Sequence, residues 1–99
     1  MKKIKRKINF KDKRGIILDL IEKENINAVT YITLNKNSIR WNQYQKKTIQ
    51  WNFILSGSIK FFSELNGKKK IFIGNKGDLI KIGIKEKHAL KGLKTSEFL

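Results

Sequence analysis

The sequence predicts an all-β domain. Segments rich in β-branched and aromatic residues recur along the chain, turn signals separate them, and no stretch keeps a helical period over the length of a helix. Segments of this kind form a β-sandwich or a small β-barrel. Because the chain has 99 residues, we expect one domain with a core of modest size.

The beginning of the chain differs in composition from the rest. Residues 1–13 are strongly basic and carry only a few apolar side chains, Ile4, Ile8 and Phe10 among them. This composition predicts a basic N-terminal arm or an edge strand, with exchange of a strand between two copies as one form of the latter. We expect residues 14–99, which carry the regular strand pattern, to form the barrel domain.

The strand pattern begins with a short apolar run over residues 15–21, and polar residues then predict a turn. Residues 28–34 are rich in β-branched and aromatic side chains and predict the next strand. Asn66-Gly67 predicts a tight hairpin turn, because both of its central residues need a positive φ. Further strands are expected over residues 49–55, 58–65, 68–73, 78–84, 88–90 and 97–99.

The formal net charge of +15 raises nucleic acid or another polyanion as a partner. Lysine supplies most of this charge, however, and Arg6, Arg14 and Arg40 are the arginines of the chain. The sequence is also rich in Ile and Asn and has no Pro, a bias that an AT-rich coding sequence produces. Proteins that read nucleic acid favour arginine. Nucleic acid is therefore not expected as the specific partner, and a polyanion-binding module is kept as an alternative.

Other classes are excluded by what the sequence lacks. With no Cys, the chain has neither a disulfide framework nor a zinc-finger module, and cytoplasmic localisation is expected. Its apolar runs are too short for a signal peptide or a membrane span, so no membrane partner is expected.

Two spaced sets of residues resemble the two cupin motifs. The first motif reads Gly, five residues, His-x-His, three or four residues, Glu, six residues, Gly; its positions are taken here by Asn37, Gln43, Gln45, Gln50 and Gly57. Asn is the residue that best replaces Gly where a left-handed backbone is needed. All the gaps between these residues fit the motif.

The second motif reads Gly, five residues, Pro-x-Gly, two residues, His, three residues, Asn. Its positions are taken by Gly77, Gly83, Lys85, His88 and Gly92, again with matching gaps. The resemblance covers residues 14–99 and implies a cupin-type double-stranded β-helix, the jelly-roll barrel.

The run from Arg40 to Gln45 is most similar to the single-domain cupins related to nucleotide-sugar epimerases and ketoisomerases. Those epimerases carry Arg-Gly-x-His-Tyr-Gln, and Arg40, Tyr44 and Gln45 match. The resemblance implies a role in carbohydrate metabolism, including polysaccharide biosynthesis, with a sugar or nucleotide-sugar ligand and a homodimeric assembly.

The metal-ligand positions of the motifs are mostly changed. Gln43, Gln45 and Gln50 replace two imidazoles and a carboxylate, and His88 keeps the remaining imidazole. An amide is a weak neutral ligand and has no pKa that would let it act as a general base. No cofactor is therefore expected, and any isomerase or epimerase activity would be metal-independent. A metal-dependent enzyme with a divalent metal at these four residues is the alternative.

Gln43 and Gln45 would share one face of a strand, and with Gln50 and His88 they would surround one enclosed polar chamber. Amides and an imidazole suit a polyhydroxylated ligand, although the same residues could face solvent. Arg40 is expected near the mouth, where its planar fork suits phosphate, or else on the plain surface. Trp41 would stack on a sugar or simply pack.

Two residues are candidates for proton transfer. His88, the sole histidine, has a suitable pKa range for a general base, and Tyr31 would be the acid if it points inward. If neither acts, the chain would be a degenerate cupin with a structural role.

Overall fold

The computed structural model describes residues 1–24, 26, 28–42 and 49–99. These residues form strands and turns without a helix, which confirms the all-β prediction. The strands are β1 Lys2–Lys5, β2 Phe10–Asp12, β3 Gly15–Ile17, β4 Ile32–Leu34, β5 Ile39–Asn42, β6 Gln50–Ser56, β7 Ser58–Leu65, β8 Lys68–Asn75, β9 Asp78–Ile82, β10 Lys87–Gly92 and β11 Ser96–Phe98.

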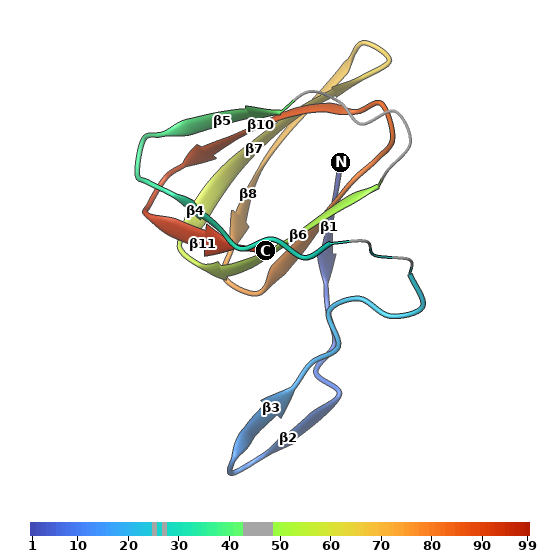
Figure 1. The fold of residues 1–99 in the computed structure, drawn as a ribbon, viewed down its shortest axis with the longest axis vertical. Helices are drawn as coiled ribbons and strands as arrows, with labels where there is room; N and C mark the ends of the chain where they lie inside the picture. The colour runs from blue at the N-terminus through green and yellow to red at the C-terminus, as the bar shows by residue number, and fades with distance from the viewer. Residues whose placement is uncertain (25, 27, 43–48) are drawn as a thin grey trace.

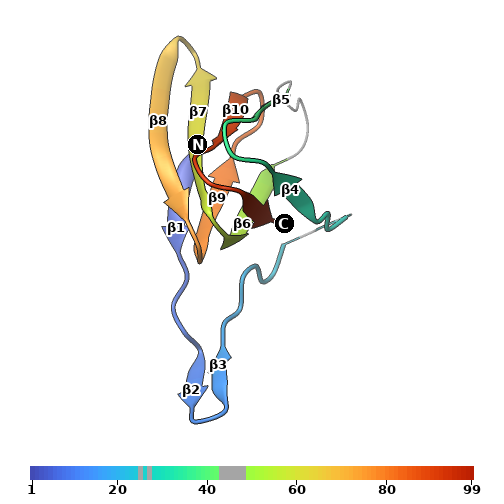
Figure 2. The same cartoon turned by 90° about the vertical axis from the view of Figure 1, so that its left-hand side faces the viewer.

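Two antiparallel sheets face each other (Figure 1). The first has five strands in the order β1-β9-β6-β11-β4, and the second has four in the order β5-β10-β7-β8. Strands β2 and β3 pair only with each other, and their hairpin projects away from both sheets (Figures 1 and 2). The first residues of the chain therefore form an edge strand, β1. The boundary between the N-terminal segment and the barrel domain after residue 13 stays a prediction.

The core fills the space between the two sheets, because inward-facing apolar residues alternate with outward-facing ones along each strand. On β7, for example, Ile59 and Phe61 are fully buried, and the Phe61 ring stacks on Phe72 of β8 at 5.5 Å between centroids. The buried core consists of Met1, Leu34, Ile54, Ile59, Phe61, Ile80, Ile82, Leu90 and Phe98.

Turn residues adopt the conformations that their types predict. Asn66 and Gly67 both have positive φ, at 52° and 76°, and close the β7–β8 hairpin. Asn37, in a position where the cupin motif has Gly, has a φ of 67°. Gly57 and Gly77, each at 89°, also need the left-handed region.

Two predicted strands are shorter than expected. The run over residues 15–21 is paired only over Gly15–Ile17, and the run over residues 28–34 only over Ile32–Leu34. Their residue types still favour strand, but a strand needs a neighbour to accept its backbone hydrogen bonds. Each run is therefore paired only as far as its partner strand in this chain extends. No helix in the described ranges is long and apolar enough to cross a membrane.

Candidate functional site

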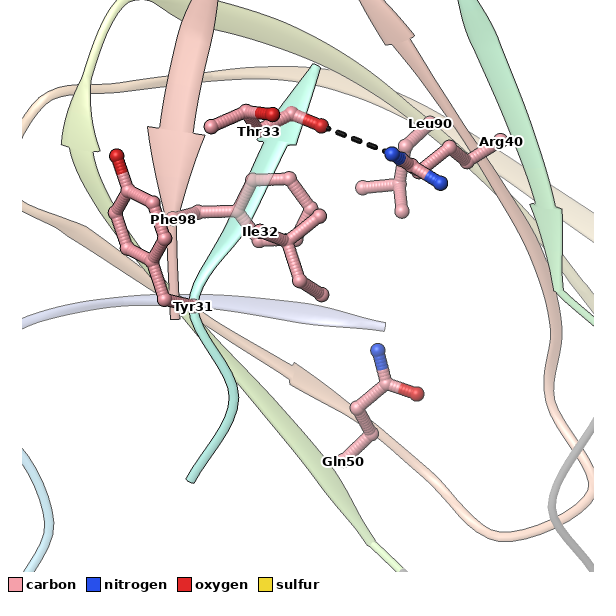
Figure 3. A pocket seen from close by; sticks show the side chains of 7 residues that line it. All are labelled: Tyr31, Ile32, Thr33, Arg40, Gln50, Leu90 and Phe98. Atoms are coloured by element: carbon pink, nitrogen blue, oxygen red, sulfur yellow. Dashed lines mark hydrogen bonds between the residues drawn. The ribbon is translucent and has the colours of Figure 1, made fainter. Parts of the chain in front are cut away.

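A cavity of about 360 Å³, partly open to solvent, lies beside the edge strand β4. Its volume is at the lower end of the range for small-molecule sites, about 300–1,000 Å³. The lining combines an apolar floor with a few polar groups (Figure 3). The residues are Tyr31, Ile32, Thr33, Arg40, Gln50, Leu90 and Phe98.

Arg40 enters this cavity from β5, directly across from Leu90 on β10. Its Nη2 donates a hydrogen bond to the carbonyl oxygen of Thr33 on β4 at 3.1 Å (Figure 3). The guanidinium thus connects the edge strands of the two sheets at the cavity rim. Because a guanidinium has five N–H donors, most of them stay available to an anionic ligand.

Gln50 lines the same cavity from the start of β6. Its Nε2 donates to Oδ1 of Asn52 at 3.3 Å, which is possible because residues two apart on a strand share a face. Asn52 is 2% exposed, and its Nδ2 has no hydrogen-bond partner among the described residues. A buried amide donor without a partner is costly, so this group is suited to a ligand or an ordered water.

His88 is buried on β10, two residues before Leu90 and on the same face of the strand. It does not line the cavity itself. Its Nδ1 lies 3.5 Å from the carbonyl oxygen of Glu86, and its Nε2 has no partner within the part of the chain that the structure describes. Burial lowers the pKa of His88, and the carbonyl and the charge of Glu86 only partly offset this effect. The imidazole is therefore neutral near pH 7.

Glu86 is a buried carboxylate that sequence reasoning missed. It forms an ion pair with the N-terminal ammonium of Met1 and accepts a 2.9 Å hydrogen bond from the Gly83 N–H. Burial would raise the pKa of Glu86, but hydrogen bonds from the ammonium, Gly83 and Ser63 lower it overall. Lys85-Glu86-Lys87 reads as a solvated turn, and no local signal marks its central residue as buried.

Tyr31 borders the cavity with its ring but is 55% exposed. Its hydroxyl points away from Gln50 and donates to a carboxylate oxygen of Glu97 (Figure 3). Ser56 donates to the other oxygen of Glu97 at 2.9 Å. These two hydroxyls lower the pKa of Glu97, while the carboxylate raises the pKa of Tyr31.

Trp41 lies outside the cavity. It is 79% exposed and stands next to Arg40 on β5, so strand alternation places the two side chains on opposite faces of the sheet. Its neighbours across the sheet are Ala89 and, beyond it, Phe62. Within one chain, Trp41 therefore lines the outer face of the four-stranded sheet rather than the cavity entrance.

The predicted polar chamber is described only in part. Gln43 and Gln45 lie outside the described residues, so their meeting with Gln50 and His88 stays a prediction. Among the residues that the structure does describe, no group of three or more His, Cys, Asp or Glu side chains is placed to hold a metal ion.

Comparisons with known proteins identify the fold. No protein-family model matches the chain, and no curated protein matches it. Among solved structures, the sugar 3,4-ketoisomerase QdtA of Thermoanaerobacterium thermosaccharolyticum, in complex with TDP, is 26% identical, with a TM-score of 0.81 over 98% of this chain and 75% of that one.

Two further structures agree in fold. The TDP-quinovose 3,4-ketoisomerase WlaRB of Campylobacter jejuni has a TM-score of 0.85 at 20% identity, over 98% of this chain and 79% of that one. The dTDP-4-dehydrorhamnose 3,5-epimerase of Sulfolobus tokodaii has a TM-score of 0.76 at 19% identity, over 97% and 65%. The chain therefore has the cupin jelly-roll fold, and its structural neighbours are nucleotide-sugar ketoisomerases and epimerases.

Proposed function

We propose that this cupin binds a sugar nucleotide in the cavity beside β4, and that any isomerisation or epimerisation it performs is independent of metal. The observation that carries the proposal is the position of Arg40 and Gln50 on one open cavity. The structural neighbour QdtA is solved in complex with TDP, a ligand with the anionic groups that an arginine at such a place would bind.

The cavity offers complementary groups to the two parts of such a ligand. The planar guanidinium of Arg40 suits the diphosphate, to which it can donate two parallel hydrogen bonds. The amide of Gln50 can both donate to and accept from sugar hydroxyls. Leu90 and Phe98 supply apolar surface for the face of a ring.

The donors in this region support metal independence. His88 supplies one imidazole, and the carboxylate of Glu86 is already paired with the Met1 ammonium and the Gly83 N–H. One imidazole and a set of amides do not fit a divalent transition metal, which prefers several imidazole or carboxylate ligands. We therefore propose that the protein carries out no metal chemistry.

Among the candidates for proton transfer, His88 stays the candidate base, although it does not line the cavity itself. Its lowered pKa leaves the imidazole neutral and able to accept a proton near pH 7. Tyr31 stays the candidate acid, although its hydroxyl is engaged by Glu97. If His88→Ala retains a detected isomerase activity at the wild-type rate, His88 is not the base.

Calorimetric titration with dTDP and with dTDP-glucose tests the binding proposal. We expect saturable binding by the wild type and a loss of about 10- to 100-fold in affinity for Arg40→Gln, since charge-assisted hydrogen bonds contribute about 1.5–3 kcal/mol. Lys68→Gln, which removes an exposed positive charge at the β7–β8 turn, is the matched control and should bind normally. Equal affinity of Arg40→Gln and wild type would reject the site.

Absence of binding by the wild type to either nucleotide would instead favour the structural-cupin alternative.

We further propose that the protein is a homodimer and acts in the cytoplasm. The open edges of both sheets support the first of these, because an unpaired edge strand is prone to associate with another chain.

A further inference from the structure

The outer face of the four-stranded sheet carries an apolar row that crosses all four strands, β5, β10, β7 and β8 (Figure 1). The strand register places Ala89 between Trp41 and Phe62. Ile71 lies beside Phe62 on the next strand. At the usual strand spacing this row is about 14 Å long. Trp41 is 79% exposed and Ile71 is 61% exposed, so both ends of the row stand in solvent. Large apolar side chains gathered on one exposed face mark a contact with another molecule.

Lysines flank the apolar row on both sides. The neighbouring row across the sheet begins and ends with isoleucine and consists of Ile39, Lys91, Lys60 and Ile73. The row on the other side is charged and includes Lys87, Glu64 and Lys69. The described part of this face therefore carries four lysines and one glutamate. The Nζ of Lys60 lies 5.4 Å from the centre of the Phe62 ring, so the lysine stem adds to the apolar surface while its charge stays at the edge.

The chemistry of this face decides between possible occupants. A second copy would bring the same lysines against these lysines, and like charges brought together at an interface are unfavourable. Single-stranded nucleic acid stacks its bases on aromatic rings, but it has no use for the exposed isoleucines Ile39, Ile71 and Ile73. A protein partner would need a hollow shaped to the protruding Trp41 ring, whereas fluid lipid adapts to it.

An anionic bilayer supplies a counterpart for each kind of side chain on the face. Its phosphate groups attract the lysines, and its acyl chains accept the isoleucines. The boundary between headgroups and acyl chains is the region that tryptophan prefers. Lysine stems can lie along the apolar row while their ammonium groups reach the headgroups.

We propose that the outer face of the β5-β10-β7-β8 sheet lies on anionic membranes, with Trp41 and Ile71 inserted at the headgroup boundary and the flanking lysines on lipid phosphates. The short apolar runs of the chain exclude a spanning segment, but binding to the surface of a bilayer needs none. The net charge of +15 draws the chain toward such a surface. Arg40 lines its cavity from the other face of the same sheet, so the cavity and the lipid contact are separate.

Flotation with vesicles tests the apolar part of the contact. We expect the wild type to bind vesicles of equal parts phosphatidylcholine and phosphatidylglycerol at physiological salt, and not vesicles of phosphatidylcholine alone. Ile71→Ser should weaken this binding about 5- to 10-fold, because less apolar area enters the lipid. Ile84→Ser changes another exposed isoleucine, in the turn before β10, and as the matched control should bind like the wild type.

A pair of charge variants separates this face from the general positive charge of the chain. Lys69→Gln/Lys87→Gln should weaken vesicle binding about 30-fold, since two lysines at an anionic surface contribute about 2 kcal/mol together. Lys76→Gln/Lys94→Gln removes the same charge from exposed positions in turns and should lose less than about threefold, because salt screens charges that stay away from the surface.

Tryptophan fluorescence reports insertion directly. The chain has two tryptophans, and Trp51 lies on the five-stranded sheet beneath Lys81. In Trp51→Phe, the emission of Trp41 should shift to the blue on addition of anionic vesicles, and lipid brominated in its acyl chains should quench it. In Trp41→Phe, neither the shift nor the quenching should occur.

Several results would overturn the proposal. Two of them are failure of the wild type to bind anionic vesicles and equal binding by Ile71→Ser and Ile84→Ser, since the latter marks adsorption by net charge alone. Tighter binding to oligothymidine than to vesicles, lost in Trp41→Ser, would assign the face to single-stranded nucleic acid. A smaller assembly of Ile71→Ser than of the wild type in sedimentation would assign it to contacts between copies. None of these measurements uses a sugar nucleotide, so they are independent of the proposed function.

Discussion

Gly57 and Ser96 lie against each other with no room for a side chain between them. Gly57 follows β6 with a φ of +89°, and a Cβ built on it would lie 2.6 Å from the Thr95 carbonyl oxygen and 2.7 Å from the Ser96 Cα. Ser96 is fully buried, and its Oγ accepts a 3.0 Å hydrogen bond from the Ser58 N–H and donates to the Lys94 carbonyl oxygen at 2.8 Å. This contact fixes β11, which supplies Phe98 to the cavity, against the turn between β6 and β7.

Gly57→Ala should therefore lower the free energy of unfolding by about 3 kcal/mol or more, since it adds backbone strain to a clash with atoms that cannot move aside. Gly67→Ala is the matched control: its φ is also positive, at +76°, but its Cβ would meet nothing within 4 Å. The control should cost about 1 kcal/mol, from backbone strain alone. Urea unfolding of both variants checks the difference, and equal losses would show that the contact with Ser96 contributes nothing.

The burial of His88 makes stability depend on pH in a defined direction. Burial lowers its pKa below the ordinary value of 6.5, so the unfolded chain takes up a proton more readily than the folded one. The free energy of unfolding should fall as the pH drops below about 6.5, by up to about 1.4 kcal/mol per pH unit until the folded protein is also protonated.

His88→Gln should abolish this slope between pH 7.5 and 5.5, because the carboxylates of the chain titrate mostly at lower pH. Urea unfolding at a series of pH values compares the variant with the wild type. The same acid slope in both proteins would assign it to other groups.

The ion pair between Glu86 and the Met1 ammonium is enclosed by the protein, so removing one charge leaves the other buried without a partner. We expect Glu86→Gln to lower the free energy of unfolding by about 3 kcal/mol. Glu64→Gln changes an exposed carboxylate on β7 and should cost less than about 1 kcal/mol.

The pH dependence of the wild type adds a check on the same group. Because the folded-state pKa of Glu86 lies below the ordinary value of 4.5, its contribution is fully present above that pH and is lost as the pH falls further. Thermal unfolding of both variants at pH 7 and pH 4 measures these effects. A Glu86→Gln protein as stable as the wild type at pH 7 would mean that the pair is not formed in solution.

Local signals in the sequence predicted the turns and most strands. Asn66-Gly67 and Asn37 adopt the positive φ angles that their residue types favour, because such preferences act within two or three residues. The shortened strands show the limit of this reasoning. Residues 28–31 have the right composition, but whether they pair depends on a neighbour that local sequence does not specify.

The candidate site was harder to predict than the fold. The cupin resemblance led to Arg40 and Gln50, which do line one cavity, whereas nothing in the sequence marked Ile32, Leu90 and Phe98 as part of a site. Glu86 was missed because a charge between two lysines has the pattern of a solvent-exposed turn. Its burial results from the arrival of Met1 from the other end of the chain, a contact over 85 positions in sequence.

Removal of metal should leave this protein unchanged. His88 is the chain's single imidazole, and the nearest buried carboxylate, Glu86, is already paired, so the described residues offer no set of ligands that would hold a divalent transition metal. We expect protein purified without an affinity tag to contain far less than one equivalent of iron, zinc, manganese or nickel by mass spectrometry.

Treatment with a chelator should leave both the thermal midpoint and the affinity for dTDP unchanged. A metal that binds the folded state would raise the midpoint by an amount that grows with the logarithm of its free concentration over the dissociation constant. A midpoint that rises on addition of zinc or manganese in the wild type, and does not rise in His88→Gln, would show a metal site at His88 and reject metal independence.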